Sequence, residues 1–202
     1  MRTFVAVELP APARRLLLDL QRRLERTLSD AHAGGLMRWT DAENLHLTLR
    51  FLGDTSTAQR DIVEGQLTSR VSRFPAFDLT LHDLGVFPNW RRPNIVWVGF
   101  AGATARLALV QAAVEQAVIQ ADFAAEERPF SPHLTIGRVK KDANTHDRQR
   151  LGELLQQEQG GSQPLLAAAA AQLTVDEIAL IQSDLRPSGP IYTTLSSYSL
   201  KG

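Results

Sequence analysis

The sequence predicts an α+β fold built from two similar halves. Stretches with strand-like alternation and stretches with helical spacing follow one another along the 202 residues. Two strand-like stretches, 44–53 (NLHLTLRFLG) and 131–140 (SPHLTIGRVK), carry the same His-x-Thr-x pattern, and their histidines lie 87 residues apart (133 − 46). Because no long Pro/Gly/Ser linker separates the halves, we expect residues 1–202 to form a single two-lobed domain with one motif in each lobe.

The first half should begin with a strand, a helix and the first motif strand. Residues 2–9 alternate as a half-buried strand does. Residues 11–30 carry leucines at helical spacing, and Pro12 suits a first helical turn. Residues 45–52 alternate again, and residues 55–73 should form a second helix capped by Thr55 or Ser56.

The middle of the chain should add two strands, a third helix and the second motif strand. Residues 76–87 alternate, whereas 95–100 form a short apolar run that is typical of a buried strand. Helical spacing continues over residues 103–123, and residues 133–139 form the second motif strand. A short helix is expected over 145–159.

The last part of the chain should be mostly extended. Residues 171–185 and 191–200 show strand patterns separated by a turn containing proline and glycine. The alanine run 167–171 is ambiguous, because its composition favours a helix while its flanks favour an extended chain.

Charge and composition exclude several classes of protein. Lys plus Arg and Asp plus Glu both total 22, so the net charge is zero and any contact with nucleic acid must come from a local cluster. The chain has no cysteine, which excludes disulfides, thiolate nucleophiles and cysteine-bound metals and fits a cytoplasmic location. No apolar run approaches the roughly 20 residues of a membrane helix, so we expect no membrane partner.

The repeated motif points to acid–base chemistry. In His-x-Thr-x on a strand, the imidazole and the hydroxyl project from the same face. Two such strands facing each other would place two imidazoles and two hydroxyls around one space. One histidine could deprotonate water, the other could protonate a leaving oxygen, and the hydroxyls could hold a phosphoryl group. This set suits a phosphodiester and requires neither a metal nor a cofactor.

Other chemistries fit the sequence less well. A zinc site needs about three ligands, and two histidines without cysteine fall short unless carboxylates join them. A serine hydrolase would need the G-x-S-x-G turn, and a nucleoside triphosphate would need the G-x-x-x-x-G-K loop, and neither occurs. The other histidines, His32, His82 and His146, lack the following threonine and are expected at the surface.

Longer stretches around the motifs resemble a known family. RWTDAENLHLTLRFLG, LGVFPNWRRPNIVWVGF, RPFSPHLTIGRV and PSGPIYTTLSSYSL resemble the two-histidine phosphoesterase superfamily, and in particular its RNA 2′,3′-cyclic phosphodiesterase branch, also called bacterial 2′-5′ RNA ligases. The resemblance implies a bilobal fold in which two antiparallel sheets face each other across a cleft with helices outside. It also implies that a 2′,3′-cyclic phosphate is opened to a 2′-phosphate.

The resemblance also assigns roles to the motif residues. His46 resembles the general acid that protonates the 3′ oxygen, and His133 resembles the base that activates water. Thr48 and Thr135 would hydrogen-bond the phosphate. Arg138 resembles a family arginine that contacts phosphate or RNA, but it is out of phase with His133, so a β-bulge near Gly137 would be needed to turn it inward.

Further substrate-binding residues are suggested near the motifs. Phe4 resembles a family aromatic that can stack a base, and Arg50 shares the predicted face of His46. The pair Arg91 and Arg92 could contact the substrate backbone from a loop. Two aromatic side chains are weaker candidates for contact with the substrate: Trp90 and Tyr192.

Two alternatives to the phosphodiesterase remain open at this point. One is an ATP-independent 2′-5′ RNA ligase that acts on tRNA halves, and the other is a non-catalytic module that binds RNA ends. The expected partners are RNA 3′ ends or nucleotides that bear a 2′,3′-cyclic phosphate, including tRNA fragments, and we expect a monomer.

Overall fold

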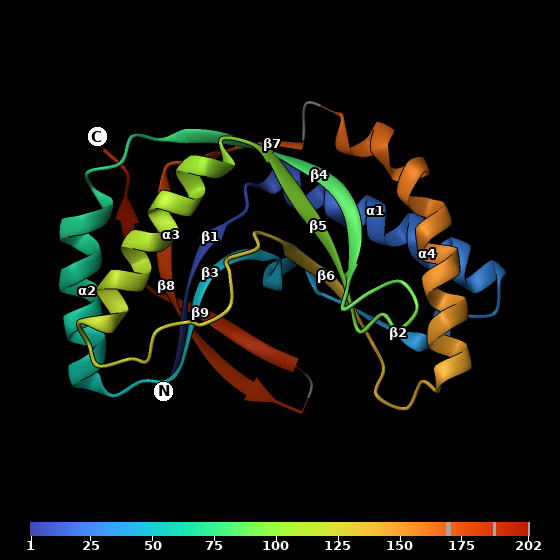
Figure 1. Cartoon of the computed structure of the whole chain (residues 1–202), viewed down its shortest axis with the longest axis horizontal. Coiled ribbons are helices and arrows are strands. Elements are labelled where there is room, and N and C mark those ends of the chain that lie inside the picture. Colours follow the sequence, from blue (N-terminus) through green and yellow to red (C-terminus); the bar gives the residue numbers. More distant parts are fainter. Residues whose placement is uncertain (169–170, 188, 202) are drawn as a thin grey trace.

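The computed structural model describes residues 1–168, 171–187 and 189–201, and it contains two antiparallel sheets with four α-helices (Figure 1). The first sheet has the strand order β3-β1-β8-β9, and the second has the order β2-β6-β5-β4-β7. Every strand pair is antiparallel. The predicted α+β class with two sheets is therefore confirmed.

The strands of the first sheet are β1 (Arg2–Glu8), β3 (His46–Asp54), β8 (Glu177–Arg186) and β9 (Gly189–Ser199). Those of the second sheet are β2 (Met37–Trp39), β4 (Phe77–Phe87), β5 (Ile95–Gly102), β6 (Leu134–Val139) and β7 (Gln172–Val175). The helices are α1 (Ala11–Asp30), α2 (Thr57–Val71), α3 (Thr104–Ile119) and α4 (Thr145–Leu166).

The helices cover the outer faces of the two sheets. In Figure 1, α2 and α3 flank the first sheet on the left, and α1 and α4 flank the second sheet on the right. Ser56 caps α2 in a capping box with Gln59, as one of the two expected caps. Within the described ranges, no helix is long and apolar enough to cross a bilayer.

Most buried apolar side chains form one large cluster that includes both sheets, and a small second cluster of Phe4, Ala6, Ala179 and Ile181 lies on the first sheet. Val7 of β1 and Leu134 of β6 both belong to it, as do Leu17 and Leu24 of α1. Neither lobe therefore buries its apolar surface independently of the other. This shared core supports our proposal of a single two-lobed domain.

Three elements differ from the sequence prediction. Residues 171–185 form two strands in different sheets, because the chain leaves β7 at Asp176 and crosses to the first sheet as β8. Helix α4 continues to Leu166 instead of ending near residue 159. Strand β2 was not anticipated. In the alanine run, residues 169 and 170 lie outside the described residues.

The extension of α4 has a tertiary cause. A Cβ added at Gly161 would meet the terminal guanidinium of Arg23, so α4 lies against α1 at this point. An ion pair of 2.9 Å between Arg23 and Glu158 lies beside this contact. Packing against α1 thus overrides the low helix propensity of the glycines.

Candidate active site

The two motif histidines occupy equivalent positions in the two sheets. His46 begins β3, and His133 directly precedes β6. Nδ1 of His46 lies 2.8 Å from the carbonyl oxygen of Asn44, and Nδ1 of His133 lies 2.8 Å from that of Ser131. A carbonyl oxygen can only accept, so Nδ1 carries the proton in both rings. When neutral, each imidazole therefore presents Nε2 as its basic nitrogen.

Aromatic rings hold each imidazole from the side. The ring centroid of His46 lies 4.7 Å from that of Phe4 and 5.2 Å from that of Tyr192. His133 has Phe87 at 5.0 Å in an edge-on arrangement. These contacts limit rotation of the rings, so that Nε2 has a defined direction in each lobe.

Burial sets the protonation state of His46. It lowers the pKa of His46 to about 4, the hydrogen bond to Asn44 opposes this shift, and the charge of Arg14 lowers the pKa further. The imidazole of His46 is therefore neutral at neutral pH in the protein without substrate.

The motif threonines lie on the same faces as their histidines. Thr48 is paired with Ala6 of β1, and Thr135 is paired with Trp97 of β5. Both threonines are partly buried, two residues along the strand from the histidine. Each sheet thus presents an imidazole and a hydroxyl on the face turned away from its helices, which we call the inner face.

Both motif strands contain a β-bulge directly after the threonine. In β3 the pairing steps from Thr48 to Arg50, so Leu49 is the extra residue. In β6 it steps from Thr135 to Gly137, so Ile136 is the extra residue. A bulge shifts the alternation by one residue. The fifth residue after each histidine therefore comes to the inner face.

The bulge in β6 brings Arg138 to the inner face. The sequence analysis expected such a bulge near Gly137 if Arg138 was to reach the site. Arg138 is exposed, and its cross-strand partner on β2 is Arg38. Its charge also acts on Tyr192 in the first sheet: burial raises the pKa of Tyr192, and Arg138 opposes that rise. Arg138 therefore lies near the ring that flanks His46.

The same bulge in β3 makes the predicted position of Arg50 wrong. Arg50 turns to the outer side, where its Nε lies 2.7 Å from Oε2 of Glu115 in α3. The two side chains form an ion pair, but the angle between them does not meet that of a hydrogen bond. Arg50 also donates to the carbonyl oxygen of Ala124. The structure therefore does not bring Arg50 to the histidines, because the unforeseen bulge reversed the alternation.

Phe51, rather than Arg50, shares the inner face with His46. Its ring centroid lies 5.8 Å from that of Phe4, and the residue is 63% exposed. Phe4 is only 2% exposed and packs beneath these rings, so it offers no free face to a base. Sequence analysis missed Phe51 because simple alternation placed it in the core. The signal that could have found it is the HLTL/HLTI similarity, which implies the same bulge in both strands.

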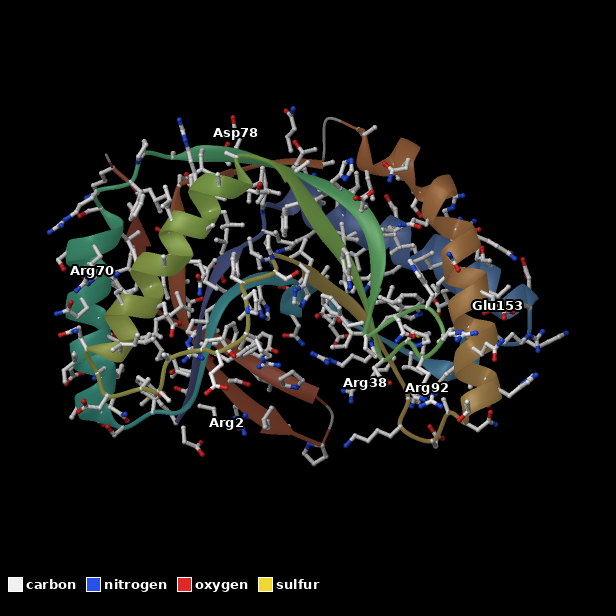
Figure 2. The ribbon with its side chains drawn as sticks, in the orientation of Figure 1. Arg2, Arg38, Arg70, Asp78, Arg92 and Glu153 are labelled. Carbon is white, nitrogen blue, oxygen red and sulfur yellow. The ribbon has the colours of Figure 1, made fainter. Side chains whose placement is uncertain are left out.

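The loop between β4 and β5 carries the remaining predicted residues. Arg91 and Arg92 are exposed, and their backbone N–H groups donate to the side chain of Asn89 (Figure 2 labels Arg92). Trp90 is partly buried against the core, so its ring is not presented as a platform. The structure does not bring Arg91 or Arg92 into contact with the histidines.

The three histidines expected at the surface are all exposed. His82 lies in β4, His32 lies in a turn after α1, and His146 lies in the first turn of α4.

Side chains also tie neighbouring segments together around the site. The amide nitrogen Nε2 of the buried Gln21 donates to the carbonyl oxygens of Thr40, at 2.8 Å, and of the bulge residue Ile136, at 2.7 Å. The Asn44 side chain donates to the carbonyl oxygen of Pro190 at 3.3 Å. Among the described residues, no group of three His, Asp or Glu side chains is placed to hold a metal ion.

Two surface hollows of the described residues lie elsewhere. One is bordered by residues 7–10 and 174–179, and the other is bordered by residues of α1 together with Leu165. Neither contains a motif histidine or threonine. The candidate site is therefore defined by the motif side chains of the two sheets and not by either hollow.

Two histidines of the same tautomer, each followed two residues later by a threonine and placed on different sheets, make up the candidate site. The family described as the 2′-5′ RNA ligase superfamily matches residues 19–187, and the chain belongs to this family.

Curated relatives extend over most of the chain. A protein of Methanothermobacter thermautotrophicus named RNA 2′,3′-cyclic phosphodiesterase is 31% identical over 200 residues, which cover 99% of both chains. A protein of the same name from Aeropyrum pernix is 34% identical over 169 residues, which cover 83% of this chain and 88% of the relative.

Solved structures share the fold. TT0787 of Thermus thermophilus superimposes with a TM-score of 0.71 and 26% identity, covering 100% of this chain and 99% of the other. LigT of Escherichia coli in its apo form has a TM-score of 0.72 at 23% identity, covering 100% and 98%. At that identity the likeness to LigT concerns the fold alone.

Proposed function

We propose that this protein is an RNA 2′,3′-cyclic phosphodiesterase that opens a 2′,3′-cyclic phosphate to a 2′-phosphate. The observation that carries the proposal is the pair of histidines on opposite inner faces, whose Nδ1 atoms are both bound to backbone carbonyls. That arrangement leaves two Nε2 atoms for one proton abstraction and one proton donation. The names of the relatives point to the same reaction.

In the proposed reaction, Nε2 of His133 takes a proton from water as the water oxygen bonds to phosphorus. The bond from phosphorus to the 3′ oxygen breaks, and Nε2 of His46 gives that oxygen a proton. The 2′ ester remains, so the product is a 2′-phosphate. His46 is neutral in the free protein, and the bound phosphodiester anion would raise its pKa by direct charge interaction.

Neighbouring side chains would bind the reacting nucleotide. The hydroxyls of Thr48 and Thr135 would donate to the phosphoryl oxygens, and the guanidinium of Arg138 would stabilise their negative charge. The exposed ring of Phe51 offers a surface on which a base could stack.

The first experiment incubates 2′,3′-cyclic CMP with metal-free protein and separates the products by chromatography. The wild type should form the 2′-phosphate, while His46→Ala and His133→Ala should each be slower by about 10²–10⁴-fold. The surface variant His82→Ala is the matched control and should retain full turnover. Undiminished turnover in His46→Ala, or a strict need for a divalent metal, would reject the proposal.

A second experiment assigns acid and base. A nitrophenyl phosphodiester has a leaving oxygen that needs no proton, so it should restore turnover to the variant that lacks the acid. We expect restoration in His46→Ala and not in His133→Ala. The opposite result would exchange the two roles while leaving the reaction class intact.

Ligation is the second candidate function, because the family is described as a 2′-5′ RNA ligase superfamily. The same site would then transfer the phosphoryl group to an RNA hydroxyl instead of water. Incubation with tRNA halves, followed by a search for a joined 2′-5′ product, tests this. Binding of a cyclic-phosphate oligomer without any turnover would instead indicate a non-catalytic module.

A cytoplasmic location and a monomeric state stay predictions, which cell fractionation and size-exclusion chromatography test.

A further inference from the structure

The inner face of the second sheet carries a tryptophan beside the second motif. Trp97 lies in β5, and its cross-strand partners are Thr135 of β6 and Gly85 of β4. Both neighbours of Trp97 along the strand are fully buried valines that belong to the core on the outer side. Because side chains alternate along a strand, the indole projects to the inner face, as do His133 and Thr135.

Two glycines leave room for the indole to lie against this face. A Cβ added at Gly85 would collide with the six-membered ring of Trp97. A Cβ added at Gly99, two residues along β5, would come 3.2 Å from Cζ3 of the same ring. Both glycines are buried. The indole therefore covers two positions of the sheet that carry no side chain.

Packing rather than hydrogen bonding holds the indole in this position. Nε1 of Trp97 is buried, and it makes no hydrogen bond to any of the residues that the structure describes. A buried indole N–H usually has a partner, so the position of this ring depends on its contacts alone. One of these contacts is with Phe87 of β4, whose ring centroid lies 5.2 Å away with the two planes inclined by 34°.

The indole and Phe87 border the imidazole of His133. The ring centroid of His133 lies 5.0 Å from that of Phe87 and 6.5 Å from that of Trp97. His133 precedes β6, and its Nδ1 lies 2.8 Å from the carbonyl oxygen of the exposed Ser131. Because the terminal torsion of a histidine side chain has broad minima, this one contact leaves the ring free to tilt. The aromatic contacts are therefore needed to fix the direction of Nε2.

The first lobe needs no such support, because the ring beside His46 is itself part of a buried cluster. Phe4 is 2% exposed and lies 4.7 Å from His46 between ring centroids. Phe87 is only partly buried, so its position depends on the indole beneath it.

We propose that Trp97 is a positioning residue, which supports Phe87 against the imidazole of His133 and so fixes the direction of Nε2. Trp97 thereby acts on the proton transfer that His133 performs, without touching the substrate. This inference rests on the proposed phosphodiesterase function. A misplacement of a catalytic group by about 1 Å can cost about 100-fold in rate, so loss of this support should lower kcat.

The experiment measures kcat and KM for 2′,3′-cyclic CMP in Trp97→Leu, which removes the indole, and in Gly85→Ala, which displaces it. In both variants kcat should fall by about tenfold or more. KM should change by less than about threefold, because the side chains proposed to bind the phosphate are unchanged. Trp97→Phe keeps a flat ring on the sheet, so its kcat should lie between those of the wild type and Trp97→Leu.

The double variant Gly85→Ala/Trp97→Leu tests whether the two positions act as one. Its added methyl group has no indole to displace, so the double variant should be no slower than Trp97→Leu alone. Additive losses would overturn the inference. The matched control is Gly65→Ala in α2, where an added Cβ meets nothing within 4 Å, and its kcat should equal that of the wild type.

Nitrogen NMR of the labelled His133 ring adds a readout that a merely structural role would not change. At alkaline pH the wild type should show one tautomer with the proton on Nδ1, and Trp97→Leu should show a mixture. An unchanged tautomer signal or an unchanged kcat in Trp97→Leu would contradict the positioning role.

The tautomer measurement needs no turnover, so failure of this inference is distinct from failure of the proposed function. The proposed function is rejected if the wild type does not open 2′,3′-cyclic CMP. Circular dichroism shows whether Gly85→Ala folds, and if it does not, the two variants of Trp97 decide the outcome.

Discussion

The chain segments at β3 and β6 resemble one another over four residues, 46–49 and 133–136, and then differ. Each carries a histidine, a threonine two residues later and one extra residue directly after the threonine. The next residue is Arg50 in β3 and Gly137 in β6, and both turn to the outer side. Arg50 pairs with α3, while Gly137 makes room for the side chains of β2.

The fifth residue after the histidine returns to the inner face in both strands. It is an exposed phenylalanine, Phe51, in the first lobe and a charged arginine, Arg138, in the second. The same β-bulge therefore exposes two different kinds of side chain: an aromatic ring that suits a base and a cation that suits a phosphate. The comparison shows that similar lobes can present different side chains two residues beyond the same bulge.

Burial also distinguishes the lobes, and the pH dependence of catalysis should show it most strongly. In the free protein, His46 carries its acidic proton only below a pH of about 4. Because His46 is the general acid of the proposed reaction, we expect kcat/KM to fall by about tenfold per pH unit as the pH rises above that value. A general acid with an ordinary histidine pKa would begin this fall only above a pH of about 6.5.

The measurement is a pH–rate profile of kcat/KM with the fold monitored in parallel by circular dichroism. Titration of His46 near pH 6.5 in the free protein, followed by NMR of its ring protons, would contradict the lowered pKa of His46. This fall in kcat should begin at a higher pH than the fall in kcat/KM, because bound phosphate favours the imidazolium of His46.

The same burial should make stability depend on pH. The pKa of His46 is about 4 when folded and 6.5 in the reference state, so between these values the unfolded chain binds a proton that the folded protein does not. The free energy of unfolding should therefore fall as pH drops from about 6.5 to about 4, by about 3 kcal/mol in total. Urea unfolding at several pH values measures this.

In this measurement, His46→Gln should remove the fall in the free energy of unfolding between a pH of about 6.5 and about 4, since glutamine does not titrate. His133→Gln is the matched variant in the other lobe and should leave this fall in place. If both variants behave alike, burial does not distinguish the two histidines.

Gln21→Leu should disturb the bulge of β6 and not that of β3. The substitution leaves the buried carbonyl of Ile136 without its side-chain donor, which costs about 1–3 kcal/mol of stability. Because that bulge turns Arg138 inward, kcat/KM should also fall by about tenfold. Urea unfolding and steady-state kinetics measure the two effects. Gln149→Leu, on the surface of α4, should change neither quantity.

Arg50→Met should lower stability more than activity, and Arg138→Met should lower activity more than stability. Arg50→Met leaves Glu115 without its ion pair, so stability should fall by about 1–3 kcal/mol while kcat/KM changes less than about fivefold. Arg138→Met removes an exposed charge, so stability should change by less than about 0.5 kcal/mol while kcat/KM falls tenfold or more. Equal losses of activity in both variants would show that Arg50 also acts at the site.

Sequence patterns were sufficient for the parts of the protein that depend on local periodicity. The amphipathic stripe of residues 11–30, the alternation around His46 and the capping serine at 56 each appear in the structure as expected. The positions of the four motif residues likewise follow from their repeated spacing, while their roles stay predictions. They could be found because strand geometry alone places His and Thr on one face.

Tertiary packing decided the rest. The bulge at Leu49 depends on pairing with the neighbouring strand, and it exchanged the faces of Arg50 and Phe51. The crossing of the chain at Asp176 depends on two sheets that share one core.

The sequence by itself therefore determined which residues can carry acid–base chemistry, because that information lies in residue types and a period of two. Only the tertiary structure decided which of their neighbours face the same space and how deeply His46 is buried. The physical reason is that strand register, solvent exposure and the pKa of a buried group depend on contacts between residues distant in the chain.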